Sequence, residues 1–463
     1  MRDQHDRRAP SQPASTRTRA VFYGDDFTGS TDALAQYHRH GLRSILLLQQ
    51  PTPARLAELA RSYDVIGIAG IARSLATGAM AAEVGPALEA LRTIQPRVVQ
   101  YKACSTGDSS PERGSLGRAI EIGRDVFGAK PVPVLIAQPE LGRYTAFGHH
   151  FAAENGEIHR LDRQPTMSRH PVTPMTEADL RIHLRRQTSL PVASLDLRAY
   201  EWSSEQALAH YQDVLARRPG AVVFDAVTQR HVEQATTLML AAGGGDGSPV
   251  FTLGSGGLSQ GLAMQLRRGH ESARVAAPDS TNPDSANGGP VLVVSGSCSP
   301  RTAEQVRWVG DRGWICVPVD VDDTDISARA RRRLRDHVLG ALATRPPGVV
   351  VSTAQRPRTA HATELLPAIG SVLADVVRTA VSEAGVRHVI VAGGDTSGRV
   401  VRWLGASAAE VAQVLGPGAV VCRLHAIEPA LQQTRLLLKG GQVGEVDLFE
   451  RMRGQDESPG TTG

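Results

Sequence analysis

The sequence predicts an α/β protein of two domains, each with a mainly parallel sheet flanked by helices. Its 463 residues exceed what a single hydrophobic core usually serves. Aromatic residues make up only 4%, while Ala, Val, Leu and Gly are plentiful, a composition that favours short buried strands between helices. Short apolar runs also alternate with amphipathic stretches at the spacing of βαβ units, which predicts parallel strands.

The first half of the chain begins this alternation. We expect helices at residues 30–41, closed by Gly41, and at residues 80–94. Residues 140–190 are rich in His, Pro, Arg and Thr without a clear period, and we expect irregular structure there. The runs expected to form strands are 19–24, 44–48, 64–70, 98–103, 131–137, 221–226 and 249–254.

The clearest break is at residues 271–290, which are polar, contain three prolines and have the composition of a linker. This break predicts a first domain at 20–270 and a second at 291–453, between a disordered leader at 1–19 and a disordered tail at 454–463. The strands expected in the second domain are 291–296, 314–320, 348–353, 387–394 and 419–424.

Charge and hydropathy exclude two classes of partner. The formal net charge is +4, but residues 2–19 hold five Arg against two Asp, so the folded part is nearly neutral. Without a basic stripe interleaved with aromatics, we expect no nucleic-acid surface. No run approaches the ~18 apolar residues of a membrane helix, and the leader lacks the apolar segment of a secretory signal.

The four cysteines are Cys104, Cys298, Cys316 and Cys422. They are far apart and form no CxxC pair, which indicates a reduced, cytoplasmic protein rather than a disulfide scaffold. We interpret Cys104 as structural.

Asp25 and Asp26 end the first strand, before a Thr-Gly-Ser turn that opens a helix. Ligands of parallel sheets bind beyond the carboxyl ends of strands, where such loops converge. Paired carboxylates there suit Mg²⁺ binding through water, hydrogen bonds from substrate hydroxyls, or proton abstraction from an alcohol. Helix capping is the alternative, and it explains Ser30 and Asp32 better than it explains two adjacent acids.

Two further strand ends carry cations. Arg73 and Ser74 follow the third expected strand, where an arginine can fork onto a substrate carboxylate or simply be a solvated loop residue. Lys102 ends the fourth strand, before a hydroxyl-rich turn with Ser105 and Thr106. Only three lysines occur among 51 basic residues, which favours a specific role for this ammonium over a surface position.

The second half contains a Gly-Ser-Cys-Ser-Pro turn between a strand and a helix. Ser299 and Pro300 fit the N-cap and the first helical position, which explains Ser299 without any function. Gly296 and Ser297 offer backbone N–H and hydroxyl groups to a phosphate or ribose.

The strongest local signal is Val-Ala-Gly-Gly-Asp-Thr-Ser-Gly-Arg at residues 391–399. Glycines allow close backbone approach, and the following helix N-terminus offers free N–H groups to an anion, although a tight turn alone is the alternative. An Arg-Val pair replaces the Lys and Ser/Thr of a P-loop, so this is no Walker A sequence. The candidates for nucleotide contact are Gly393, Gly394, Asp395 and Thr396, together with Lys439 and Gly441 in a later glycine-rich turn.

Four histidines occur in the irregular region: His149, His150, His159 and His170. Their spacing matches no zinc template and no cysteine is near, so we expect no metal site made by these side chains. His170 is a candidate for substrate contact or an ordered loop histidine.

In their order along the chain, these segments resemble the four-carbon acid sugar kinase family, which phosphorylates threonate, erythronate and 3-oxo-tetronates. The chain departs from the common pattern at Cys104, where an acid usually precedes the Ser-Thr pair, and at residues 139–152, which makes 3-oxo-isoapionate a candidate substrate. The resemblance is carried by Asp25, Asp26, Thr28, Gly29, Arg73, Ser74, Lys102, Ser105, Thr106, Gly296–Ser299, Gly393–Gly398 and Lys439–Gly441.

The resemblance implies ATP and Mg²⁺ as cofactors, a small sugar acid as partner, and in-line phosphoryl transfer between an N-terminal substrate domain and a C-terminal nucleotide domain that close across residues 271–290. It assigns catalysis to Asp25, Asp26 and Lys102, and substrate binding to Arg73, Ser74, Ser105 and Thr106. To these we add His170 as a substrate-binding candidate from its own loop. The resemblance assigns nucleotide binding to Ser297, Ser299, Gly393, Gly394, Asp395, Thr396, Lys439 and Gly441.

Two other functions fit parts of the pattern. A dinucleotide-dependent oxidoreductase needs a G-x-G-x-x-G turn with an acid about 20 residues later, and none is found. A non-catalytic sugar-acid sensor would share the pocket without turnover. The sequence is compatible with a homo-oligomer and does not fix the number of subunits.

Overall fold

A computed structural model describes most of the chain. The described residues are 18–154, 156–170, 172–243, 247–268, 289–297, 299–319, 327–353, 362–432 and 434–453. The expected leader up to residue 17, the expected linker up to residue 288 and the expected tail lie outside them. None of the helices in the described part is long and apolar enough to cross a bilayer.

The N-terminal half has the parallel sheet that the sequence predicts. Its strands are β1 (Ala20–Gly24), β2 (Ser44–Leu47), β3 (Val65–Ala69), β4 (Val98–Lys102), β5 (Val132–Leu135), β9 (Val192–Leu195), β10 (Ala221–Phe224) and β11 (Val250–Gly254). All their pairings with one another are parallel. Its longer helices are α1 (Phe27–Arg39), α2 (Pro53–Ser62), α3 (Met80–Arg92), α4 (Leu116–Phe127), α6 (Ser204–Ala216), α7 (Gln229–Ala242) and α8 (Gly256–Arg268).

The C-terminal half has a second, mainly parallel sheet. Parallel strands are β12 (Val291–Ser295), β13 (Ile315–Pro318), β14 (Gly348–Ser352), β15 (His388–Ala392) and β18 (Arg435–Lys439), while β16 (Ala408–Gly416) and β17 (Ala419–His425) are antiparallel to their neighbours. The helices are α9 (Pro300–Gly310), α10 (Ala328–Ala343), α11 (Ala362–Glu383), α12 (Gly394–Leu404), α13 (Pro429–Gln432) and α14 (Leu448–Arg453). The predicted fold class is confirmed.

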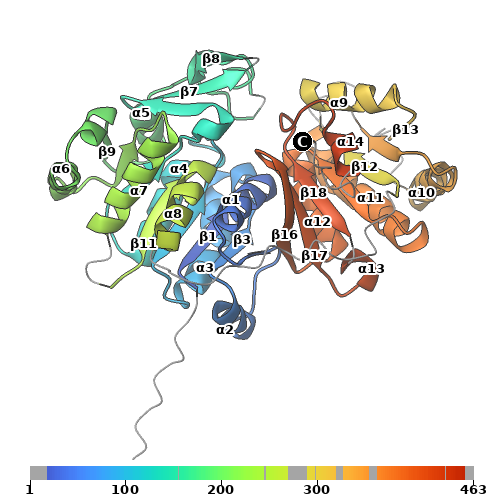
Figure 1. The fold of residues 1–463 in the computed structure, drawn as a ribbon, viewed down its shortest axis with the longest axis horizontal. Coiled ribbons are helices and arrows are strands. Elements are labelled where there is room, and N and C mark those ends of the chain that lie inside the picture. Colours follow the sequence, from blue (N-terminus) through green and yellow to red (C-terminus); the bar gives the residue numbers. More distant parts are fainter. Residues whose placement is uncertain are drawn as a thin grey trace, which may run out of the picture.

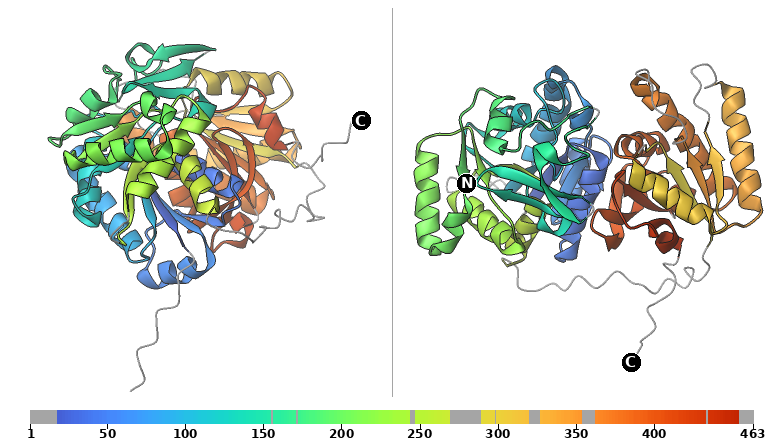
Figure 2. Two further views of the ribbon diagram at one scale, coloured as in Figure 1. Left: turned by 60° about the vertical axis from the view of Figure 1, so that its left-hand side comes forward. Right: turned by 90° about the horizontal axis from the view of Figure 1, so that it is seen from above.

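The two sheets are joined edge to edge, which the sequence did not predict. Antiparallel pairing of β16 with β2 produces one sheet in the order β13-β14-β12-β15-β18-β17-β16-β2-β3-β1-β4-β11-β5-β10-β9. The two halves lie side by side along this junction (Figures 1 and 2). A further backbone bond runs from Leu48 N to Ser407 O at 3.0 Å, and Arg402 pairs with Glu83 at 3.5 Å.

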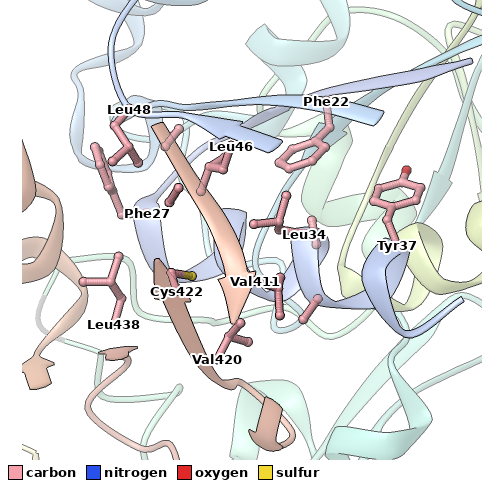
Figure 3. Close-up of a cluster of buried hydrophobic side chains, with 14 of the residues drawn as sticks. Phe22, Phe27, Leu34, Tyr37, Leu46, Leu48, Val411, Val420, Cys422 and Leu438 are labelled. Carbon is pink, nitrogen blue, oxygen red and sulfur yellow. The ribbon is translucent and has the colours of Figure 1, made fainter. Parts of the chain in front are cut away.

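Apolar side chains also cross the junction. One hydrophobic cluster includes Phe22, Phe27, Leu34, Leu46 and Leu48 from the N-terminal half with Val411, Val420, Cys422 and Leu438 from the C-terminal half (Figure 3). The N-terminal members come from β1, α1, β2 and the residue after β2, and the C-terminal members come from β16, β17 and β18. Because burial of apolar surface stabilises this contact, α1 is fixed against both halves.

Helix α1 begins at Phe27 rather than at residue 30, because Asp26 is its N-cap and accepts a hydrogen bond from Gly29 N at 2.6 Å. Asp32 therefore lies in the second turn, and the interpretation that it caps the helix is wrong. Ser30 does not cap either, since its hydroxyl donates to Asp26 O at 2.5 Å.

The prediction of irregular structure at residues 140–190 was wrong in part. A separate antiparallel sheet is formed by β6 (Arg143–Ala146), β7 (His149–Glu154) and β8 (Glu157–Arg160), and helix α5 (Leu180–Arg185) follows (Figure 1). Its strands are short and mostly half-buried, so they show little hydrophobic alternation. They pack on a small core of Ala152, Leu161, Met167, Met175 and Ala178.

Candidate active site

Sheet order brings three predicted segments together. Strand β1 lies between β3 and β4, and Gly24 pairs in register with Ala69 on one side and Lys102 on the other. The carboxyl ends of all three strands therefore meet at one edge. Asp25 N donates to Lys102 O at 3.0 Å, and Arg73 N donates to Asp25 O at 3.1 Å, so backbone bonds hold the three loops together.

Asp26 is fully engaged within the protein. Its Oδ1 accepts the bond from Gly29 N, and its Oδ2 pairs with Arg73 Nη2 at 2.6 Å. Burial alone lowers the pKa of an arginine, but Asp26 and Asp108 hold the Arg73 pKa well above its usual value. Arg73 is a permanent cation beside the acids.

Asp25 is buried, and its Oδ1 has no hydrogen-bond partner among the residues that the structure describes. Burial raises its pKa to about 7, helped by the neighbouring Asp26 charge, while Arg73 and Lys102 oppose the rise. A buried acid that titrates near neutrality and has an oxygen without a hydrogen-bond partner is suited to accept a proton from a ligand.

Lys102 is also buried, at the N-terminal end of α1. Its Nζ donates to Ala103 O at 2.9 Å and lies 3.8 Å from Asp32 Oδ2. Gln138 also donates to the Asp32 carboxylate, at 3.3 Å. A Cβ on Gly29 would lie 3.0 Å from Lys102 Nζ, so the absence of a side chain there leaves room for the ammonium.

The loop after β4 adds a third acid. Thr106 Oγ1 donates to Asp108 Oδ1 at 2.7 Å and lies 3.0 Å from Cys104 Sγ. Burial alone raises the pKa of Asp108, but Arg73 and the Thr106 bond hold it below its usual value. Asp108 was not among the predicted residues. The common family pattern has an acid just before its Ser-Thr pair. In this chain Asp108 follows the pair instead, and that nearby acid was the signal that could have identified it.

Three predicted substrate residues make mainly protein contacts. The Ser74 hydroxyl donates to Ile71 O at 3.0 Å within its own turn. Ser105 accepts a bond on its backbone oxygen from His150 at 2.9 Å. His170 Nδ1 accepts from Thr173 N at 3.0 Å, and His170 is close enough to influence the pKa of Asp108.

The predicted nucleotide residues also converge. Gly393 is the N-cap of α12 at a φ of 113°, and a Cβ there would lie 3.3 Å from both Ser297 N and Thr396 Oγ1. A Cβ on Gly441 would lie 3.0 Å from Ser297 Oγ and 3.5 Å from Ser299 Oγ. Three loops therefore pack around the N-terminus of α12. Asp395 lies in its first turn, and its side chain is outside the described part of the structure.

Ser299 differs from its expected capping role. It occupies the N-cap position of α9 but makes no side-chain capping bond. Its buried Oγ lacks a hydrogen-bond partner within the described parts of the chain. Because a buried hydroxyl is usually hydrogen-bonded, this group is available to a ligand at the Gly441 turn.

Lys439 forms hydrogen bonds to the Gly441 turn and to helix α9. Its Nζ donates to Thr302 Oγ1 at 2.9 Å and to Gly441 O at 3.5 Å. Burial, with a smaller effect from Arg301, lowers the Lys439 pKa to about 7. Lys439 thus ties the end of β18 to the first turn of α9.

The two sets of residues meet at the junction of the halves. A Cβ on Gly394 would lie 3.0 Å from Arg73 Nη2 and 3.8 Å from Asp26 Oδ2. Likewise, a Cβ on Gly440 would lie 3.6 Å from Thr28. The N-termini of α1 and α12 therefore face one site, which is the arrangement that transfer between two bound ligands requires.

Two family descriptions match most of the chain. Residues 20–262 match a sugar-binding N-terminal domain, and residues 292–449 match a nucleotide-binding C-terminal domain. A 3-oxo-isoapionate kinase of Paraburkholderia graminis is 36% identical over 94% of this chain and 93% of its own length. A 3-oxo-tetronate kinase of Methylobacterium radiotolerans is 30% identical over 92% of this chain and 96% of its own.

Solved structures show the same fold at lower identity. A Salmonella typhimurium protein aligns with a TM-score of 0.74 at 23% identity, covering 95% of this chain and all of that one. A Haemophilus influenzae protein aligns with a TM-score of 0.67 at 22% identity, over 94% of this chain and all of that one. With the domain matches and the two-part site, the chain belongs to the four-carbon acid sugar kinase family.

Proposed function

We propose that the protein is an ATP-dependent kinase of a 3-oxo sugar acid of the 3-oxo-isoapionate type. The observation that carries the proposal is the contact between the Asp25–Asp26–Arg73 cluster of one half and Gly394, at the N-terminus of α12, of the other. The identity of 36% with a 3-oxo-isoapionate kinase, against 30% with a 3-oxo-tetronate kinase over a similar share of the chain, supports this substrate class over a 3-oxo-tetronate.

Asp25 is the proposed base. Both Asp26 oxygens are engaged, by Gly29 N and by Arg73, whereas Asp25 Oδ1 has no partner in the described residues. The alcohol of the acid would donate its proton to Asp25 as its oxygen attacks the terminal phosphorus of ATP and the bond to the ADP oxygen breaks. Asp26 then serves to hold Arg73.

Cations would position the two ligands. Lys102, with the hydroxyl-rich Ser105–Thr106 turn, would anchor the carboxylate of the acid. Arg73 stands between the half-sites, where its fork can hold an anionic oxygen from either ligand in line with the other. Phosphoryl transfer depends mainly on holding the two ligands in line and on balancing the charge of the transition state. A cation between the two half-sites can serve both needs.

The nucleotide phosphates would lie at the N-terminus of α12, where free backbone N–H groups favour anions. Ser297, Ser299 and the Gly441 turn line the same region. Among the described residues no cluster of three or more His, Cys, Asp or Glu could hold a metal on its own. Mg²⁺ usually binds one or two carboxylates plus phosphates. Because both Asp26 oxygens are engaged and Asp25 Oδ1 is assigned to the alcohol, Mg²⁺ would be held chiefly by the phosphates of ATP. When bound, Mg²⁺ would neutralise phosphate charge.

A coupled ADP-release assay tests the proposal directly. With ATP and Mg²⁺, we expect turnover with 3-oxo-isoapionate at a kcat/KM at least about tenfold above that for 3-oxo-tetronate, threonate or erythronate, since small differences in pocket fit give factors of this size. Mass spectrometry of the product should show one added phosphoryl group. ATP binding without phosphorylation of any of these acids would contradict the proposal and favour a sensor.

Lys439→Met is expected to raise the KM for ATP by about tenfold with little change in the KM for the acid. The substitution removes the bonds that Lys439 Nζ donates to Thr302 Oγ1 and to Gly441 O, together worth roughly 1–2 kcal/mol, without disturbing the N-terminal half. Separate KM measurements for the two substrates check this. Lys130→Met, at an exposed lysine, is the matched control, and an effect of Lys439→Met confined to the acid would contradict the assignment.

A further inference from the structure

Two buried histidines that the proposed reaction does not use both contact the loop after β4. His150 in β7 has no exposed surface. Its Nε2 lies 2.9 Å from Ser105 O, and its Nδ1 lies 2.9 Å from Thr145 Oγ1. His183 in α5 is likewise buried, with its Nε2 at 2.8 Å from Ser109 Oγ.

The partners of His150 determine its protonation. The Ser105 carbonyl only accepts, so Nε2 must carry the hydrogen and donate. Burial lowers the His150 pKa to about 4, which keeps the ring neutral. Nδ1 therefore carries no hydrogen and accepts from the Thr145 hydroxyl.

The partners of His183 determine the opposite tautomer. Gln187 Oε1 accepts from Leu116 N at 2.8 Å, so the Gln187 amide nitrogen must be the atom that points at His183 Nε2, at 2.9 Å. An amide nitrogen only donates, and His183 Nε2 therefore accepts and carries no hydrogen. The Ser109 hydroxyl then donates its one hydrogen to His183 Nε2 at 2.8 Å and accepts from Gln187 Nε2 at 2.9 Å.

Both histidines come from the small unit of β6, β7, β8 and α5, and both hold the loop of residues 104–110. The same loop carries Asp108, which accepts a bond from Thr106 and whose charge raises the pKa of Arg73. A loop held at Ser105 and at Ser109 cannot shift Asp108 relative to Arg73 without breaking one of these buried bonds, which costs about 1–3 kcal/mol each.

We propose that His150 and His183 are positioning residues that fix the loop of residues 104–110 in the shape that accepts the organic acid. The small β6–β8 and α5 unit thereby selects the acid without contributing a reacting group. The inference rests on the proposed kinase function. It explains why polar rings lie in a buried contact where apolar side chains would pack at lower desolvation cost.

His150 offers a graded test. His150→Leu removes the donor to Ser105 O, whereas His150→Gln retains an N–H at nearly the same reach. We expect His150→Leu to raise the KM for the acid about tenfold to a hundredfold, with the KM for ATP changed less than twofold. His150→Gln should recover most of the loss. His159→Leu, on β8 of the same small sheet and near Glu157, is the control and should behave as wild type.

Coupling to Asp108 separates positioning from a general structural role. If His150 acts through the loop, His150→Leu and Asp108→Asn should be non-additive in kcat/KM for the acid, because each disturbs the same electrostatic interaction between Asp108 and Arg73. Additive effects, or equal rises in both KM values, would overturn the inference. An inactive wild type would instead contradict the proposed function, and ADP release by wild type is therefore measured first.

Discussion

Asp25→Asn is expected to lower kcat by about 10²–10⁴, the range usually lost with a general base. The amide cannot take the proton of the attacking alcohol, although its size and position are the same. Because the Asp25 pKa is raised to about 7 by burial and by Asp26, wild-type kcat/KM for the acid should rise with pH up to about 7 and then level off. The variant should lose this rise.

The same substitution should stabilise the fold at alkaline pH. The folded pKa of Asp25 is raised, so between about pH 4 and pH 7 the folded state keeps a proton that the unfolded chain releases. The free energy of unfolding therefore falls as pH rises from about 4 through 7. Above pH 7 the folded protein carries the full cost of the buried Asp25 charge. Asn avoids the cost. We expect a gain on the order of 1–3 kcal/mol at pH 8 that shrinks by pH 5.

Thermal unfolding at the two pH values, alongside ADP release, measures both effects in one protein. Asp162→Asn is the matched control, because Asp162 pairs with Arg160 at 2.5 Å on the small sheet away from the site. A variant with wild-type kcat would remove Asp25 from the role of base. If the variant is less stable than wild type at pH 8, and more so than at pH 5, then neighbouring groups stabilise the charged Asp25 carboxylate in the folded protein.

Arg73→Lys is the second substitution with a large expected effect, a fall in kcat/KM of about 10²–10³. The retained charge still balances Asp26, so the fold should persist. The shorter point charge cannot hold Asp26 and an oxygen beside Gly394 at the same time, as a planar fork can. Loss of an interaction made mainly in the transition state lowers kcat, whereas loss of ground-state binding raises KM.

Steady-state kinetics in both substrates distinguish these cases. A fall in kcat with little change in either KM would place Arg73 on the transferred phosphoryl group, and a rise in the KM for the acid alone would place it on the carboxylate. Arg118→Lys, at a helical arginine paired with Glu121, should have no effect. Wild-type kinetics in Arg73→Lys would contradict any role of the fork at the junction of the halves.

The buried strands and the candidate residues at their ends could be predicted from local sequence. Short apolar runs such as Val-Leu-Val-Val at residues 291–294 form buried strands, because a strand covered on both faces of a parallel sheet needs apolar side chains at every position. Polar residues that directly follow such runs must lie at the carboxyl edge of a parallel sheet. The candidates Asp25, Lys102 and Gly393 could therefore be placed at that edge from the order of residues alone.

The small β6–β8 sheet was missed for a related reason. Its strands are short, and its interior contains Thr145 and His150, which hydrogen-bond to each other, while His150 also bonds to the loop after β4. A pattern of hydrophobic residues cannot reveal strands whose buried positions are polar. The capping interpretation of Asp32 failed similarly, because its partners Lys102 and Gln138 come from other strand ends.

The sequence by itself determined the fold class and the family, since these depend on neighbours along the chain, and for the same reason it could propose residues for both half-sites. Only the tertiary structure decided that β2 and β16 join the sheets and that Arg73 lies beside Gly394. It also decided that Asp25, rather than Asp26, has an oxygen without a hydrogen-bond partner in the described residues. The physical reason is that burial and charge at a site are set by groups that are distant in sequence and close in space.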